Sequence, residues 1–178
     1  MRIIAGKNKG ATITAPPGTR TRPTADRVRE AVFSILGSVE GLAVLDLFAG
    51  SGALGLEALS RGAAVAELVD NRAGAAKTIA KNIAKLGLRN AGLNRRDYRS
   101  FLKDAAGKGR VFDLIFVDPP YKMHRVIEPE LKKWLPQVAV SGGRVVVESD
   151  ASQAVMLPLE LITDKVYGET RIRVFRAT

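Results

Sequence analysis

Four aspartates are the residues of this sequence best placed to bind a ligand or take part in catalysis, because each comes at the end of a short run of the kind that forms a strand. They are Asp46, Asp70, Asp97 and Asp118. In an open α/β sheet, ligands bind outside the carboxyl ends of the strands, so carboxylates placed there would face a common site. A single aspartate at a strand exit is more commonly a turn or helix-cap residue. Four in succession along one edge indicate a ligand site instead.

A glycine-rich turn follows the first of these aspartates. Gly50, Gly52 and Gly55 satisfy the pattern Gly-x-Gly-x-x-Gly between an expected strand and an expected helix. Glycines there let the backbone approach a ligand, although the same pattern also occurs where a turn is merely tight. Since Asp46 would repel a pyrophosphate of the same charge, the combination favours a ligand with an ammonium group.

The fourth aspartate opens the motif Asp118-Pro-Pro-Tyr121, directly after an apolar run at residues 114–117. That run is typical of a central strand buried on both faces. Pro-Pro alone would mark an ordinary strand end. With the other carboxylates at the same edge, the motif predicts a site in which Asp118 accepts hydrogen bonds and Tyr121 stacks on a flat ligand.

Composition narrows the chemistry further. The chain has 178 residues, 46% of them hydrophobic, which fits one well-cored domain. The absence of cysteine excludes thiol nucleophiles, disulfides and cysteine-bound metals, and the single histidine argues against a catalytic triad or a histidine-rich metal site. We therefore expect no metal. No apolar run is long enough for a membrane span or a signal peptide, so a soluble cytoplasmic protein without a membrane partner is expected.

The net charge of +10 and the pI near 10.2 favour a polyanionic partner such as nucleic acid, although a solvated basic surface would look the same. Residues 1–36 hold seven Lys or Arg but only two acids, and a second group of cations follows Tyr121. The candidate nucleic-acid contacts are Lys7, Lys9, Arg20, Arg22, Arg27, Lys122 and Arg125.

Strand-like and helix-like patterns alternate from residue 43 onward, which predicts right-handed βαβ units and a mostly parallel sheet with helices on both faces. The expected strands are residues 43–47, 64–69, 91–94, 111–117 and 144–148, and the expected helices are 53–61, 72–86, 98–105 and 127–135. Residues 161–167 and 171–175 leave no room for a helix between them. They should form an antiparallel hairpin at the sheet edge and complete a seven-stranded Rossmann-like α/β fold.

A smaller unit precedes this alternation. Residues 2–4 and 11–14 predict a basic β-hairpin, residues 15–23 an exposed arm, and residues 24–36 a helix with Thr24 as its N-cap. We expect residues 1–38 to be a nucleic-acid-binding extension and residues 39–178 the domain that holds the strand-end site.

Three motifs in this order give the sequence a family resemblance. Asp46-Leu-Phe-Ala-Gly-Ser-Gly52 and Asp118-Pro-Pro-Tyr121 resemble motifs of the S-adenosylmethionine-dependent amino-methyltransferases. The N-terminal segment Thr21-Arg-Pro-Thr-Ala-Asp-Arg-Val-Arg-Glu30 is similar to that of the RsmD-type bacterial enzymes, which methylate guanine N2 in 16S ribosomal RNA. The resemblance runs nearly from end to end.

The resemblance implies S-adenosylmethionine as cofactor and 16S ribosomal RNA as partner, within an assembled or assembling small subunit. It implies that the methionine part lies near Asp46 and the glycine loop, the ribose near Asp70, the adenine near Asp97, and the target base near Asp118. The implied cofactor-binding residues are Asp46, Phe48, Gly50, Ser51, Gly52, Asp70, Asn71, Asp97 and Tyr98, and the implied catalytic residues are Asp118, Pro119, Pro120 and Tyr121.

Other functions stay open from the residues alone. The acceptor of the same cofactor's methyl group could be adenine N6, cytosine N4 or a protein amide. The glycine pattern also permits a nicotinamide-dependent oxidoreductase, although Asp46 and the lack of a substrate domain argue against it. A catalytically silent RNA-binding module would explain the charge. For the oligomeric state we expect a monomer.

Overall fold

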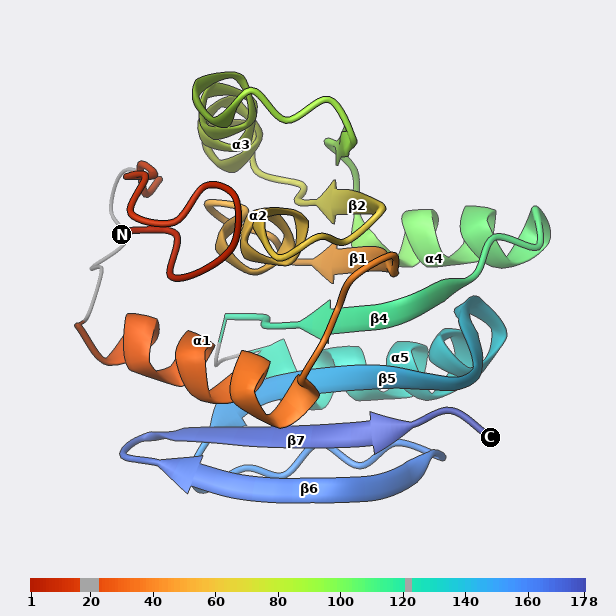
Figure 1. Ribbon diagram of the computed structural model, residues 1–178. Helices are drawn as coiled ribbons and strands as arrows, with labels where there is room; N and C mark the ends of the chain where they lie inside the picture. Colours follow the sequence, from red (N-terminus) through yellow and green to blue (C-terminus); the bar gives the residue numbers. More distant parts are fainter. Residues whose placement is uncertain (17–22, 121–122) are drawn as a thin grey trace.

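A single mixed β-sheet runs through the protein, in the order β3-β2-β1-β4-β5-β7-β6 (Figure 1). The structure, a computed structural model, describes residues 1–16, 23–120 and 123–178. Its strands are β1 (Ala43–Leu47), β2 (Val65–Val69), β3 (Ala91–Asn94), β4 (Phe112–Val117), β5 (Ala139–Asp150), β6 (Glu160–Tyr167) and β7 (Thr170–Arg176). Its helices are α1 (Pro23–Leu36), α2 (Ala53–Ser60), α3 (Ala73–Leu86), α4 (Tyr98–Gly107) and α5 (His124–Val138).

The first five strands are parallel, whereas β7 pairs antiparallel with both β5 and β6. The predicted Rossmann-like fold with a C-terminal antiparallel hairpin is therefore confirmed. The strand order reverses between β1 and β4, because the chain builds outward to β3 and then returns to the other side of β1. Such a switch point opens a crevice at the carboxyl ends of the two strands.

Helices cover both faces of the sheet, each over a separate hydrophobic cluster (Figure 1). On one face α1, α2 and α3 pack on side chains such as Leu68 and Phe116, and the ring of Phe33 from α1 lies 5.8 Å from that of Phe116. On the other face α4 and α5 pack on side chains such as Leu47 and Ile115. Since α1 shares its core with the sheet, the N-terminal unit is built into the fold rather than tethered to it.

Two predicted elements proved too short. The prediction for β5 was residues 144–148, because Ser-Gly-Gly at 141–143 resembles a turn, but the strand continues through it. Gly142 takes φ +78°, and a Cβ on Gly143 would lie 2.8 Å from the Val140 carbonyl oxygen, so the two glycines make an irregular stretch inside the strand. Helix α5 likewise extends beyond the predicted residues 127–135, with Pro129 and Pro136 inside it.

The predicted N-cap at Thr24 is wrong, because α1 already begins at Pro23. Proline suits the first position of a helix, where its missing N–H would have no partner anyway. The remaining boundaries differ from the predictions by one or two residues, which is the ordinary uncertainty of helix and strand ends.

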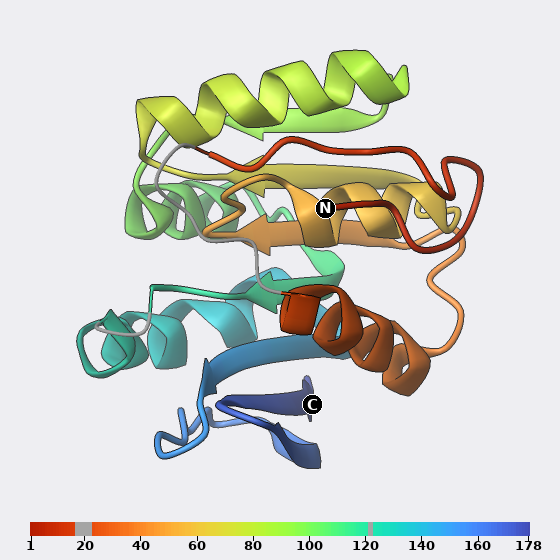
Figure 2. The same cartoon turned by 90° about the vertical axis from the view of Figure 1, so that its left-hand side faces the viewer.

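The N-terminal segment folds back as predicted, and it runs alongside α2 and α3 (Figure 2). Arg2 pairs antiparallel with Thr12, and the side chains of Ile3 and Ile13 are buried. Asn82 of α3 holds this segment in place. Its side chain accepts a hydrogen bond from Thr14 N and donates to Thr14 O and to Ser51 O in the glycine loop, each at 2.9 Å.

None of the helices that the structure describes combines the length and the apolar character needed to cross a bilayer.

We predict that Asn82→Ala destabilises the fold, because it removes three hydrogen bonds of a fully buried side chain and leaves the buried Ser51 O without its partner. A lost hydrogen bond costs about 0.5–1.5 kcal/mol and an unpaired buried group about 1–3 kcal/mol, so the free energy of unfolding should fall by at least about 2 kcal/mol. Urea denaturation measures this. The control Gln137→Ala removes a surface hydrogen bond within α5 and should change stability by less than about 0.5 kcal/mol. Equal effects of the two substitutions would contradict the role given to Asn82.

Candidate functional site

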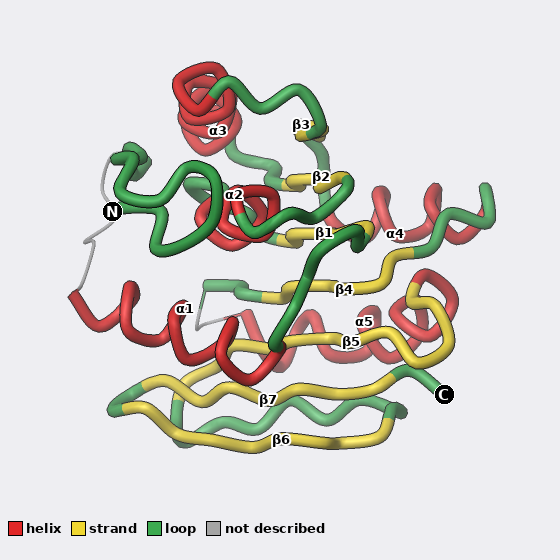
Figure 3. Tube along the Cα trace, viewed as in Figure 1, coloured by secondary structure: helices red, strands yellow, loops and turns green. Residues whose placement is uncertain are grey.

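A cavity of about 450 Å³ opens where the parallel strands end. Loops that leave the carboxyl ends of β1, β2 and β4 form its rim, together with the end of β5 (Figure 3). Arg29 and Val32 of helix α1, which packs on one face of the sheet, also line the cavity. The size fits a cofactor, since such sites typically measure about 300–1,000 Å³.

Three carboxylates point into this cavity from neighbouring strands: Asp46 from β1, Asp118 after β4, and Glu148 from β5. The strand register explains their common direction. Asp46 pairs with Phe116 and Phe116 with Val146, and side chains two residues apart on a strand share a face. Asp118 and Glu148 are therefore level with each other, one pleat beyond Asp46.

The glycine loop has the backbone conformation that its sequence predicts. Gly52 takes φ +80°, and a Cβ there would lie 2.9 Å from Leu68 Cδ2. Phe48 is the one described residue other than glycine with a positive φ, +63°. Such conformations cost energy in residues that carry a Cβ, and they concentrate at functional sites. Here the strained backbone places the Phe48 ring on the cavity wall.

Asp46 connects this loop to the strand. Its Oδ2 accepts a hydrogen bond of 2.9 Å from Gly55 N at the start of α2, while its side chain is almost fully buried. Burial raises the pKa of Asp46 to about 7, assisted by the nearby charges of Asp118 and Asp70, although the bond from Gly55 acts in the opposite direction. A cationic ligand would favour the charged form of this carboxylate.

Burial also raises the pKa values of the other two carboxylates. It raises the pKa of Asp118 to about 6. Burial, together with the charge of Asp118, raises the pKa of Glu148 to about 9. Since like charges side by side in a low-dielectric pocket are unfavourable, at least one of these groups is protonated at neutral pH when no ligand is bound.

Asp70 follows β2 and is held from several directions. It accepts hydrogen bonds from Gly50 N at 3.0 Å and from Arg72 N at 2.9 Å, and Arg72 Nε and Nη2 complete an ion pair. Burial acts to raise the pKa of Asp70, but the bonds from Arg72 and Gly50 outweigh it, and the pKa lies below its usual value. Asp70 thus joins the glycine loop to the end of β2, and Arg72 holds the Asp70 carboxylate in place.

A second cavity of about 100 Å³ adjoins the first and contains the predicted adenine-side residues. The rings of Phe48 and Tyr98 lie 4.9 Å apart on its wall. Asp97 lines it as well, although its Oδ1 caps α4 by accepting a bond from Arg99 N at 2.9 Å. The two cavities share Phe48, Arg72 and Pro120. Of the remaining predicted cofactor residues, Gly50 and Ser51 line the first cavity and Asn71 the second, whereas Gly52 is among the lining residues of neither.

The Asp118-Pro-Pro-Tyr121 motif is partly described. Asp118, Pro119 and Pro120 line the main cavity, whereas Tyr121 and Lys122 lie outside the described residues. The side chain of Arg125 also lies outside them.

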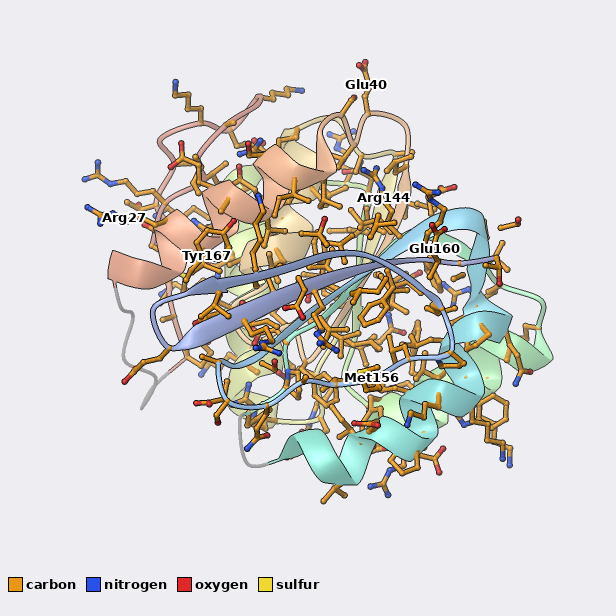
Figure 4. All side chains as sticks on the ribbon, turned by 90° about the horizontal axis from the view of Figure 1, so that it is seen from below. Arg27, Glu40, Arg144, Met156, Glu160 and Tyr167 are labelled. Carbon is orange, nitrogen blue, oxygen red and sulfur yellow. The ribbon has the colours of Figure 1, made fainter. Side chains whose placement is uncertain are left out.

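The structure does not bring all of the predicted RNA contacts to the cavity. Lys7 and Lys9 are exposed on the N-terminal hairpin, but neighbouring Gly6 packs on Ser60 at the far end of α2, about 12 Å along that helix from the glycine loop. Arg27 projects outward from α1 (Figure 4). Arg20 and Arg22 lie outside the described residues. These basic residues stay predictions.

Sequence reasoning missed several residues of the site, chiefly Glu148 and Arg72. The signal for Glu148 was present, because the fifth expected strand ends in an acid as the first four do. Nothing in the sequence indicated that Met1 and Arg29 would line the cavity, since this depends on how α1 and the N-terminal segment pack.

The chain is similar to known proteins along nearly its whole length. The family model described as conserved hypothetical protein 95 matches residues 1–176. The chain is 37% identical to ribosomal RNA small subunit methyltransferase D of Escherichia coli, over 99% of this chain and 89% of that protein. It is 34% identical to the protein of the same name from Buchnera aphidicola, over 88% of this chain and 81% of that one.

A solved structure extends the likeness to three dimensions. A hypothetical protein of Thermus thermophilus superposes with a TM-score of 0.85 at 32% identity, covering 99% of both chains.

The raised pKa values predict that the ligand-free protein loses stability as pH rises. The pKa values of Asp46, Asp118 and Glu148 in the folded protein lie above their usual values near 4. Their contribution to the free energy of unfolding is therefore fully present below about pH 4. It declines as each group ionises, up to about pH 9. The lowered pKa of Asp70 acts only at more acidic pH. Urea denaturation between pH 5 and pH 9 should show the decline, and Glu148→Gln should flatten it above pH 7. Parallel curves for the two proteins would contradict the assignment.

Proposed function

Because this chain belongs to the RsmD-type family of ribosomal RNA methyltransferases, as its sequence predicts, we propose that it methylates the exocyclic N2 amine of a guanine in 16S ribosomal RNA. The methyl donor is S-adenosylmethionine. One observation carries the proposal: Asp46 and Asp118 flank the strand-order reversal on one face of the sheet, with a glycine loop beside the first and a Pro-Pro turn after the second.

The residues on the Asp46 side fit the cofactor. Asp46 supplies a buried negative charge for the ammonium group, and the glycine loop permits close approach of the backbone. Asp70 would accept from the ribose hydroxyls, and Phe48 with Tyr98 offers ring surfaces for the adenine. When bound, S-adenosylmethionine supplies an electrophilic methyl group on a sulfonium, which needs no further activation.

The residues on the Asp118 side fit the acceptor. The lone pair of a guanine amine is delocalised into the ring, so the nitrogen is a poor nucleophile. If the Asp118 carboxylate and the Pro119 carbonyl accept its two N–H bonds, the nitrogen becomes more pyramidal and its lone pair turns toward the donor. Pro119 and Pro120 have no N–H of their own, which leaves acceptors facing the amine.

Asp118 would also accept the proton that the amine loses after methyl transfer. Transfer of a methyl group to a neutral amine leaves that nitrogen with one proton to lose. The Asp118 carboxylate, which already accepts an N–H bond from the amine, would take this proton.

The surroundings of the site support an RNA partner. The chain has a net charge of +10, and Lys7, Lys9 and Arg27 are exposed on the unit formed by residues 1–38. Phosphate contacts from such residues give affinity without reading sequence. The substrate we propose is the small ribosomal subunit, assembled or nearly so, acted on in the cytoplasm by a monomer.

Methyl transfer onto small subunits from a strain lacking this enzyme tests the proposal. Tritium from labelled S-adenosylmethionine should enter 16S RNA, and nucleoside mass spectrometry should identify N2-methylguanosine. Label in N6-methyladenosine, in N4-methylcytidine or in protein would replace the proposed acceptor, and no transfer at all would overturn the function.

In the same assay Asp118→Ala should lower kcat by at least about 100-fold, since it removes an acceptor aimed at the reacting amine. The control Glu40→Ala, an exposed position outside the cavity, should keep wild-type activity (Figure 4). Full activity of Asp118→Ala would contradict the mechanism.

A further inference from the structure

We propose that Glu148 selects guanine as the target base, by accepting a hydrogen bond from the ring N1–H next to the reacting N2 amine. This inference rests on the proposed function and deepens it, because it names the residue that sets base specificity.

The position of Glu148 in the sheet places it beside the part of the base that adjoins the reacting amine. The three strands lie in the order β1, β4, β5, so Asp118 stands between Asp46 on one side and Glu148 on the other. If the methyl donor lies on the Asp46 side, the amine that faces Asp118 lies between the donor and Glu148. The atoms of the base next to that amine then lie within the part of the cavity that Glu148 lines.

Glu148 differs from another buried glutamate, Glu57, in having no hydrogen-bond donor from the described part of the protein. Glu57 of α2 is fully buried and satisfied by the protein itself, since it accepts from Ile4 N at 2.8 Å, Ala5 N at 3.0 Å and Arg61 Nε at 2.7 Å. No described group donates a hydrogen bond to the Glu148 carboxyl, although the strand carries it into the cavity wall. An acid that the fold leaves without a donor is available to a ligand that brings one.

An arginine that lines the same cavity does not pair with Glu148, because it already binds other groups. Arg29 of α1 lines the same cavity, but its guanidinium donates to the Arg2 carbonyl and to Asp26, and its Nε lies 3.7 Å from Glu57. A metal is no better supported, since the described residues contain no cluster of acids and histidines arranged to bind one.

The chemistry of the bases selects among possible ligands. Guanine, adenine and cytosine all present an exocyclic amine beside a ring nitrogen. In guanine that nitrogen, N1, has a hydrogen, whereas adenine N1 and cytosine N3 are acceptors. An acceptor pair made of Asp118 and Glu148 therefore matches the adjacent N2–H and N1–H donors of guanine. Against adenine or cytosine, the Glu148 carboxylate would meet a lone pair.

This selectivity requires the ionised carboxylate, because a protonated Glu148 could donate to adenine N1 or cytosine N3 as a glutamine amide would. The positive charge of the bound methyl donor favours that ionised form. Burial keeps Glu148 protonated when no ligand is bound, which is how it tolerates the neighbouring Asp118. A hydrogen bond from guanine N1–H favours the ionised carboxylate, because hydrogen bonding to the charged form lowers a pKa. Binding of guanine should therefore be accompanied by loss of a proton from Glu148.

Base analogues at the target position test the proposal. Small subunits are reconstituted with 16S RNA that holds either guanine or 2,6-diaminopurine at the position methylated by the wild-type enzyme. Both bases have the 2-amine, but N1 of diaminopurine has no hydrogen. We expect the wild type to prefer guanine by about 10- to 100-fold in kcat/KM, since a site built for a donor rejects an analogue that lacks it.

The Glu148→Gln variant should lose most of this preference and gain activity on diaminopurine, because its amide can donate to an unprotonated N1 as well as accept from N1–H. A merely structural role for Glu148 would lower activity on both bases by the same factor and leave the ratio unchanged, and that result would overturn the proposal. Glu40→Gln is the matched control and should retain the wild-type ratio. Failure of the wild type to methylate guanine at all would overturn the proposed function instead.

Discussion

The structure depends on placing three carboxylates side by side in one buried cavity. Asp46, Asp118 and Glu148 share one face of the sheet, and none of them has an ion-pair partner among the described residues. Burial of like charges without counter-ions opposes folding, so the protein relieves it by protonation. The same constraint prepares the cavity for a ligand with a positive charge and several N–H donors. S-adenosylmethionine and a guanine amine together have both properties.

The remainder of the fold keeps this cavity in shape. The strand reversal between β1 and β4 places Asp46 and Asp118 on neighbouring strands, about 4.8 Å apart across the sheet and one pleat apart along it, and opens the crevice above them. Two hydrophobic clusters, one on each face, fix the strands. Asn82 then joins α3, the N-terminal segment and the glycine loop through three hydrogen bonds. The N-terminal unit thus contributes to the cavity, through Met1 and Arg29, as well as to the basic surface.

The sequence allowed most of the fold to be predicted, because the alternation of apolar runs and amphipathic segments depends on local pattern. A cavity beside Asp46, Asp70 and Gly50 was also predictable, since these residues lie in short motifs at the strand ends. Glu148 was missed although the expected strand 144–148 ends on it, because it lies outside the short motifs on which the prediction of the site relied. The approach of Arg29 and Met1 depends on packing between distant segments, and no local pattern encodes it.

The central claim is that one cavity has two sides with separate tasks, with Asp46 binding the methyl donor and Asp118 orienting the acceptor. Calorimetric titration of S-adenosylmethionine into Asp46→Asn and Asp118→Asn tests it most directly, since both changes remove one carboxylate charge without changing shape. The account predicts that Asp46→Asn weakens binding by at least about 10-fold, because it removes the charge opposite the ammonium group. Asp118→Asn should change the affinity by less than about 3-fold. Equal losses in the two variants, or a larger loss in Asp118→Asn, would contradict the division of the cavity.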